Sequence, residues 1–212
     1  MRLRNNPKAL DIMKENTHLV VVDPRNYKGK WCEIFDNNNP IYIEIGMGKG
    51  DFIYQHALNN PHINYVGIEK YPSVLASAIN KMKIKDKVSN LRLITFDAIE
   101  LNDIFEKDEL DLIYLNFSDP WPKSRHEKRR LTSATFLDVY KNNLKAKGSI
   151  EFKTDNRGLF EYSLTSFNNY LMKFKYVSLD LHNSEYFEEN VMTEYEQKFC
   201  IKGPIYKLVA KF

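Results

Sequence analysis

The chain has 212 residues, of which 43% are hydrophobic and 28% are charged, and these proportions are ordinary for one folded α/β domain. The net charge of +3 is too small to indicate a nucleic-acid partner by itself. Cys32 and Cys200 lie far apart without CxxC spacing, which argues against a disulfide framework and a zinc site. No apolar run is long enough to span a membrane and the N-terminus has no secretory signal, so we expect a cytoplasmic protein.

Residues 1–40 are mostly polar and basic, apart from an apolar patch at residues 19–22 and a Lys-Gly-Lys-Trp turn at residues 28–31. We interpret this part as an N-terminal extension that docks on the main domain. The main domain then comprises residues 41–212, and we find no internal repeat within it.

From residue 41 onward, predicted strands alternate with predicted helices. Segments with helical spacing, such as residues 73–82 and 132–144, separate short runs rich in β-branched residues. This alternation indicates a parallel sheet with helices on both faces. The runs that predict strands are residues 41–45, 64–69, 91–95, 111–117 and 149–154.

Two late apolar runs, residues 176–181 and 205–212, would complete the sheet with its sixth and seventh strands. Gly203 and Pro204 directly precede the last run and predict a tight turn. We therefore expect a hairpin, and hence one antiparallel strand in a seven-stranded, mostly parallel α/β fold.

A glycine-rich loop, Glu44-Ile-Gly46-Met-Gly48-Lys-Gly50, follows the first predicted strand. Glycine lets the backbone adopt positive φ and approach a ligand closely. The GxGxG spacing differs from the GxGxxG of NAD-binding loops, and Glu44 would repel a pyrophosphate. The same carboxylate would attract the ammonium and sulfonium of S-adenosyl-L-methionine (SAM). The loop therefore favours SAM as the cofactor.

Three further acids follow the next three predicted strands. Glu69 is placed to bind both ribose hydroxyls, although NAD enzymes use an acid in the same way. Asp97 is placed either to accept a hydrogen bond from the adenine amino group or to cap a helix that begins near Ala98. With Glu44 and Asp119, these acids would line the crevice where open α/β sheets bind ligands.

The segment Asn-Phe-Ser-Asp-Pro-Trp-Pro-Lys at residues 116–123 combines an acid, Asp119, with the flat ring of Trp121 between two prolines. The prolines indicate a shaped loop, in which Trp121 either stacks on a base or wedges the loop. Positive residues follow, either as a solvated helix start or as an RNA contact, which we favour. They are Lys123, Arg125, Lys128, Arg129 and Arg130.

Over nearly its whole length the chain resembles the bacterial tRNA (guanine-N7-)-methyltransferases. The resemblance implies a class I SAM-dependent methyltransferase (Rossmann-like) fold for residues 41–212. It also implies transfer of a methyl group from SAM to N7 of a guanosine in the tRNA variable loop. The motifs that carry it are EIGMGKG at 44–50, GIEKY at 67–71, LNFSDPWPKSRHEKRR at 115–130, FKTDN at 152–156 and TEYEQKF at 193–199.

The same resemblance implies roles for individual residues. Residues expected to contact SAM are Glu44, Glu69, Asp97 and Asp119, with Gly46 and Gly48 in the loop. Residues expected to contact the substrate are Lys123, Asp155, Thr193, Glu194, Tyr195 and Glu196. Thr193 and Glu196 also have the spacing of a helix capping box. The expected partner is tRNA, bound by a monomer or a homodimer.

N7 of guanine carries a free lone pair, so its methylation needs no strong base, metal or covalent nucleophile. We expect Asp119 to lie closest to the reaction, as a fixed negative charge near the ring. Asp119, Asp155 and Glu196 are each candidates to accept hydrogen bonds from guanine's N1–H and amino group. N7 lies in a groove of A-form RNA that side chains reach poorly, so we expect the guanine to be turned out of its stack.

Three other functions are compatible with parts of this pattern. A SAM enzyme that acts on an exocyclic amino group is disfavoured because Trp121 separates the two prolines. An RNA-binding relative without catalysis is disfavoured by the four intact acids. An NAD-dependent oxidoreductase is disfavoured by the glycine spacing.

Overall fold

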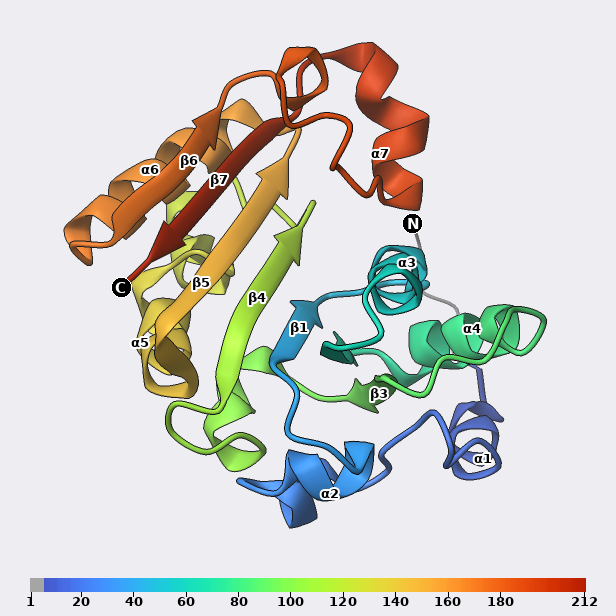
Figure 1. Ribbon diagram of the computed structural model, residues 1–212. Coiled ribbons are helices and arrows are strands. Elements are labelled where there is room, and N and C mark those ends of the chain that lie inside the picture. Colours follow the sequence, from blue (N-terminus) through green and yellow to red (C-terminus); the bar gives the residue numbers. More distant parts are fainter. Residues whose placement is uncertain (1–5) are drawn as a thin grey trace.

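The computed structural model describes residues 6–212 and is built around one seven-stranded sheet, in the order β3-β2-β1-β4-β5-β7-β6 (Figure 1). Neighbouring strands are parallel except at β7, which runs antiparallel to both β5 and β6. The predicted fold class, with one antiparallel strand, is confirmed. The strands are β1 (Ile41–Ile45), β2 (Asn64–Glu69), β3 (Leu91–Thr95), β4 (Leu110–Asn116), β5 (Leu144–Thr154), β6 (Lys173–Ser178) and β7 (Tyr206–Lys211).

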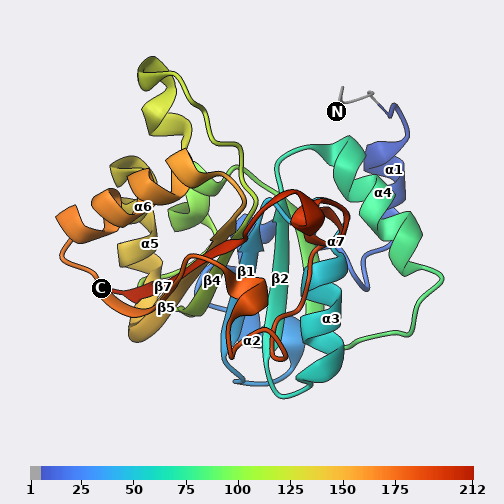
Figure 2. The same ribbon diagram turned by 90° about the horizontal axis from the view of Figure 1, so that it is seen from above.

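Helices cover both faces of the sheet (Figure 2). Successive side chains of β4 point to opposite faces, so Leu112 and Tyr114 enter one apolar core while Ile113 and Leu115 enter the other. The first core includes residues of α1, α3 and α4, and the second includes residues of α2, α5 and α6. The helices are α1 (Ala9–Lys14), α2 (Trp31–Phe35), α3 (Asp51–Asn59), α4 (Pro72–Met82), α5 (Ala134–Asn143), α6 (Arg157–Asn169) and α7 (Glu194–Phe199).

The predicted tight turn at Gly203 and Pro204 is wrong, although β6 and β7 do pair antiparallel as expected. Gly203 has an extended backbone, with φ of 163°. The connection from β6 to β7 instead carries α7 and two short 3-10 helices, η4 (Leu181–Asn183) and η5 (Cys200–Lys202). The strand ends at Ser178, and the chain then buries Leu181. Residues distant from Gly203 therefore determine this connection.

The described part of residues 1–40 packs on the rest of the chain. Val20 forms a β-bridge with Leu93, at the outer strand β3. Trp31 is fully buried, its ring lies 5.0 Å from that of Phe105, and its Nε1 donates to the Ile104 carbonyl at 2.8 Å. The division at residue 40 stays an interpretation of the sequence, and residues 1–5 lie outside the described part.

Within residues 6–212, no helix has the length and apolar character that crossing a bilayer requires. Cys32 and Cys200 are both free thiols.

The carboxyl ends of β1 to β5, together with the loops that follow them, position the site described below.

We expect Trp31→Ala to lower the free energy of unfolding by about 3–5 kcal/mol, because it removes a buried ring and leaves the Ile104 carbonyl unpaired. Urea denaturation measures this loss. Leu10→Ala is the control, since Leu10 in α1 is 60% exposed and its loss should stay within about 0.5 kcal/mol. Equal losses in the two variants would contradict docking of this segment.

Candidate active site

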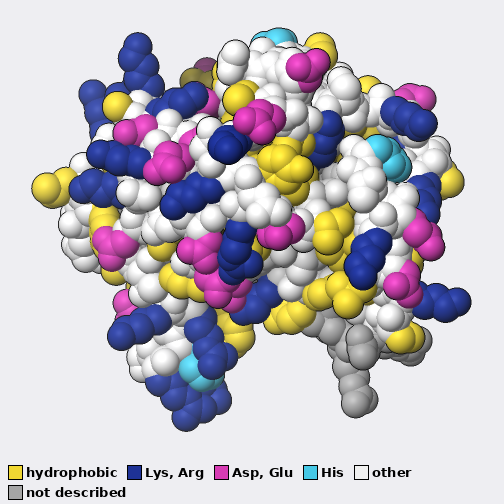
Figure 3. Space-filling model, turned by 90° about the horizontal axis from the view of Figure 1, so that it is seen from below, with side chains coloured by type: hydrophobic (Ala, Val, Ile, Leu, Met, Phe, Trp, Pro, Cys, Tyr) yellow, Lys and Arg dark blue, Asp and Glu magenta, His cyan; other side chains and the backbone are white. Residues whose placement is uncertain are grey.

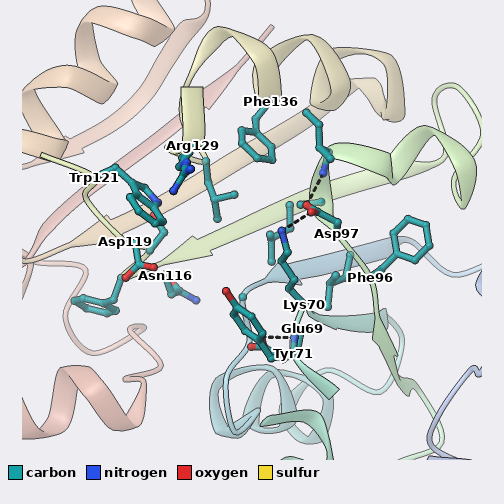
Figure 4. A pocket seen from close by; sticks show the side chains of 18 of the residues that line it. Glu69, Lys70, Tyr71, Phe96, Asp97, Asn116, Asp119, Trp121, Arg129 and Phe136 are labelled. Carbon is teal, nitrogen blue, oxygen red and sulfur yellow. Dashed lines mark hydrogen bonds and ion pairs between the residues drawn. The ribbon is translucent and has the colours of Figure 1, made fainter. Parts of the chain in front are cut away.

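A cavity of about 800 Å³ opens where the carboxyl ends of β1, β2, β3 and β4 meet. Figure 4 shows Glu69 and Asp97 on one side of it and Asp119 and Trp121 on the other. Parallel strands bring their carboxyl ends to one edge of the sheet, which is why side chains so far apart in sequence converge here. Gly46 of the glycine loop also lines this cavity.

The glycine loop leads from β1 into α3 with three residues in the left-handed region. Gly46 has φ of 75° and Gly48 has φ of 58°, and a Cβ added at either would meet nothing within 4 Å. These two positions need glycine for conformation and leave open space beside the backbone. A Cβ on Gly50 would come within 2.5 Å of Cε of Met82, so this glycine also permits close packing on α4.

Glu44, at the carboxyl end of β1, is buried, with only 2% of its surface exposed. Its Oε1 accepts a hydrogen bond from Nδ2 of Asn116 at 2.9 Å, while its buried Oε2 has no hydrogen-bond partner. Burial raises the pKa of Glu44 from 4.5 to about 8. Burial thus favours the neutral form of this carboxyl group.

Glu69, at the end of β2, is buried and binds the glycine loop. Its Oε2 accepts from the Gly48 amide and its Oε1 from the Tyr71 amide, each at 3.1 Å. Burial raises the pKa of Glu69, against the effect of these amides. Each carboxylate oxygen has a further lone pair, so the geometry leaves room for ribose hydroxyls as additional donors.

Asp97 follows β3 and lines the same cavity. Its Oδ1 accepts from the Ile99 amide at 3.3 Å, which caps the 3-10 helix η2 (Ala98–Asp103). Its Oδ2 pairs with Nζ of Lys70 at 2.5 Å. The capping alternative is thus present in the structure, and the role of Asp97 towards adenine stays a prediction.

The loop after β4 holds Asp119 in an unusual backbone path. Phe117 has φ of 50° and Trp121 has φ of 41°, values that are uncommon for bulky residues and typical of strained functional loops. The guanidinium of Arg130 donates to the carbonyls of Pro120 and Trp121 at 3.0–3.3 Å. Arg130 therefore fixes this loop, a role that the sequence analysis missed when it grouped Arg130 with the RNA contacts.

The other basic residues lie on the 3-10 helix η3 (Ser124–Arg129) and just before it. This yellow-green segment projects from the molecule in Figure 2, and Figure 3 shows Lys and Arg side chains gathered on a projection at the lower left. The guanidinium of Arg129 lies 4.9 Å above the Trp121 ring, beside the cavity. Lys123, Arg125 and Lys128 are exposed. Trp121 thus packs within its own loop while it lines the cavity.

A smaller cavity, of about 130 Å³, separates the glycine loop from the start of α7. Thr193, Glu194 and Tyr195 line it together with Phe117. Tyr195 lies 5.1 Å from Phe117 between ring centroids, and its hydroxyl donates to Oδ2 of Asp155 at 2.9 Å. Most of the predicted substrate residues are therefore brought to one side of the site.

Two predicted substrate residues lie differently. Lys123 is exposed and lines neither cavity; the same is true of Asp155, but Asp155 is hydrogen-bonded to Tyr195 at the smaller cavity. Glu196 is fully buried, and it forms the predicted capping box with Thr193. Its Oε2 pairs with the buried Lys153 at 2.8 Å, a partner that the sequence analysis missed. The only sign of this ion pair in the sequence is that Lys153 interrupts the apolar residues near the end of β5.

The comparisons with known proteins agree with this geometry. A family model described as "Putative methyltransferase" matches residues 38–208. The fold is similar to that of an antibiotic-related methyltransferase, with a TM-score of 0.63 and 20% identity over 86% of this chain and 91% of that one. It is also similar to a 30S ribosomal A1408 methyltransferase from an uncultured bacterium, with a TM-score of 0.62 and 16% identity over 90% of this chain and 94% of that one. The fold and the site define a class I methyltransferase.

Two curated relatives are each named tRNA (guanine-N(7)-)-methyltransferase. The protein of Bacillus licheniformis is 55% identical, over 100% of this chain and 99% of the relative. The protein of Listeria innocua is 56% identical over the same shares. The chain belongs to this family of tRNA (guanine-N7-)-methyltransferases, as its motifs predicted.

The raised pKa of Glu44 predicts how stability depends on pH. Its folded-state pKa of about 8 exceeds the ordinary 4.5. Between these two pH values the folded protein binds one more proton than the unfolded chain, so it loses stability as the pH rises. Glu44→Gln cannot titrate. Relative to this variant, we expect the natural protein to lose on the order of 2 kcal/mol of unfolding free energy between pH 5.5 and 8.

Urea denaturation without cofactor at several pH values measures this difference. All other titrating groups are common to the two proteins and cancel in the comparison. Parallel stability profiles would contradict the raised pKa of Glu44.

Proposed function

We propose that this chain transfers a methyl group from SAM to N7 of a guanosine in the variable loop of tRNA. One observation carries the proposal: the main cavity is bounded by Glu69 and Asp97 on one side and by Asp119, beside a basic projection, on the other. The names of the relatives identify guanine N7 of tRNA as their target. The proposed product is 7-methylguanosine.

The residues around the glycine loop fit SAM. The unpaired Oε2 of Glu44 suits its ammonium group, and the free lone pairs of Glu69 suit ribose hydroxyls. Gly46 and Gly48 leave the space for a close approach, and Asp97 would face the adenine. When bound, SAM supplies a methyl group that is activated by its sulfonium.

The chain's own residues have to orient the guanine and stabilise charge, because N7 already carries its lone pair. Positive charge accumulates on the purine as it is methylated. The Asp119 carboxylate is held near the proposed position of the ring by a loop that Arg130 fixes, and a preorganised charge of this kind stabilises the transition state. Phe117 and Tyr195 offer flat rings beside the smaller cavity.

The exposed positive residues of the η3 segment are suited to tRNA phosphates. Lys123, Arg125 and Lys128 are exposed on a segment that projects from the molecule (Figure 2), and Lys128 also lines the main cavity together with Asp119. The guanidinium of Arg129 lies over the Trp121 ring, and the exposed Arg129 side chain would donate to a phosphate or a ribose. The monomeric or homodimeric state and the cytoplasmic location stay predictions.

We expect methyl-labelled SAM and unmodified tRNA to yield 7-methylguanosine after digestion of the RNA. Asp119→Asn should lower kcat on the order of 10²–10³-fold, because it removes a charge that stabilises the transition state. The affinity for tRNA should stay within about threefold, because this charge acts little on the ground state.

Asp108→Asn is the matched control, an exposed aspartate outside both of the cavities described above. Its kcat should equal that of the natural chain. Formation of N6-methyladenosine, or of no methylated nucleoside, would refute the proposed reaction. Equal losses of kcat and tRNA affinity in Asp119→Asn would show that Asp119 acts only in binding tRNA.

The basic projection predicts a steep dependence of tRNA affinity on salt. Changing Lys123, Arg125 and Lys128 together to Gln should reduce the slope of log K against log salt by roughly 2 to 3, because three phosphate contacts are lost. Titration of labelled tRNA at several salt concentrations measures the slope.

A control variant carries the same change at Lys141, Lys145 and Lys147, which are exposed and lie around the start of β5, far from its site-facing end. The change in net charge is identical, but the slope should stay that of the natural chain. Equal slopes in the two triple variants would show that the projection does not contact phosphates.

A further inference from the structure

A buried ion pair lies behind the substrate side of the site. Nζ of Lys153, near the end of β5, is 2.8 Å from Oε2 of Glu196, in the first turn of α7. The two side chains are 4% and 0% exposed. Among residues 6–212, Lys153 is the only lysine or arginine that is buried. Burial of both charges is costly, so this pair needs a structural or functional reason.

Every hydrogen-bonding position of the Glu196 carboxylate is occupied within the protein. Oε1 lies 2.7 Å from Nε2 of His182 and accepts from Nδ2 of Asn190 at 2.8 Å. Oε2 accepts from Lys153 at 2.8 Å and from the Thr193 amide at 3.4 Å. A carboxylate has about four lone-pair sites. Glu196 therefore has none left for the N1–H and amino group of a guanine.

Lys153 is equally engaged. Besides Glu196, its ammonium donates to Oδ1 of Asn190 at 3.0 Å and to the Val191 carbonyl at 2.9 Å. An ammonium has three donors, so all of them are used. Its Nζ also lies 5.0 Å from the ring centroid of Phe52, in the first turn of α3. Lys153 is thus enclosed by protein and does not reach a phosphate or a base.

The neighbours of Glu196 in sequence do face the site. Tyr195 donates to Asp155, and Glu194 forms an ion pair with Lys81 of α4. Helix α7 has only six residues, and helices of this length depend on tertiary contacts for stability. Glu196 supplies the buried contacts of its first turn, whereas those of Glu194 and Tyr195 are partly exposed.

We propose that Glu196 and Lys153 are positioning residues: their ion pair fixes α7 so that Thr193, Glu194 and Tyr195 border the site, and Glu196 does not contact the guanine. The choice of guanine as the base rests on the proposed function. Of the three carboxylates considered for the guanine edge, Asp119 and Asp155 are exposed and remain available.

The test compares two tRNAs, one with guanosine and one with inosine at the target position. Inosine lacks the amino group that an edge-binding carboxylate would recognise, but it keeps N7. The variants are Glu196→Gln, Lys153→Met and the double variant. Lys145→Met is the matched control, because Lys145 is an ion-paired lysine of the same strand that lies on the surface.

We expect each single variant to lower kcat/KM for the natural tRNA by about 100-fold, since a displacement of about 1 Å has this effect on reacting groups. The double variant should be no worse than the worse single variant, because the two side chains act as one unit. The ratio of kcat/KM for guanosine to that for inosine should stay within about twofold of the natural enzyme. Lys145→Met should change neither quantity.

A ratio that collapses tenfold or more in Glu196→Gln but not in Lys153→Met would overturn the proposal, because Glu196 would then recognise the amino group. Additive losses in the double variant would also overturn it. Lys153→Arg, which keeps the charge, should recover part of the activity lost in Lys153→Met.

Hydrogen exchange of the amides of residues 197–199, in the protein without RNA, tests independently of catalysis whether the ion pair fixes α7. Both single variants should exchange faster there, while β1 and β4 stay protected. Unchanged exchange would overturn the proposal. Absence of 7-methylguanosine with the natural chain would refute the proposed function, and the exchange data would still decide whether the pair anchors α7.

Discussion

Burial of the Glu44 carboxyl group at the end of β1 is the constraint on which the site depends. A charged carboxylate in an apolar core is costly unless hydrogen bonds or a cation compensate for the lost water. Asn116 supplies one hydrogen bond, and Lys153 acts against the rise in the pKa of Glu44 that burial causes. One oxygen remains unpaired beside a loop whose glycines leave open space. The proposed function assigns this oxygen to the ammonium group of SAM.

Lys153 interacts both with the buried Glu44 and with α7 on the other side of the site. Its ammonium pairs with Glu196, and its charge also acts on Glu44. The strand β5 therefore carries one buried cation that influences the cofactor side through Glu44 and holds the substrate side through α7. In a medium of low dielectric constant such charges interact strongly, which is why one misplaced group would disturb both sides.

The loop that carries Asp119 is held in place in a different way. Two bulky residues, Phe117 and Trp121, adopt left-handed backbone angles, and this strain persists because Arg130 holds the carbonyls of the loop. Solved methyltransferases of 20% identity or less share the fold of this chain. The acceptor of the methyl group is determined by such loops rather than by the fold.

The sequence by itself determined the order of strands and helices, the glycine loop, and the acids at the strand ends, because each of these is a local pattern. The structural role of Arg130 and the pairing of Lys153 with Glu196 were decided only by the tertiary structure. Lys153 and Glu196 are 43 residues apart, and nothing in their local spacing indicates that they pair. The tight turn predicted at Gly203 failed for the same reason, since the packing of α7 and Leu181 determines that connection. Burial and pairing of a charge are properties of the packed chain, so short motifs do not encode them.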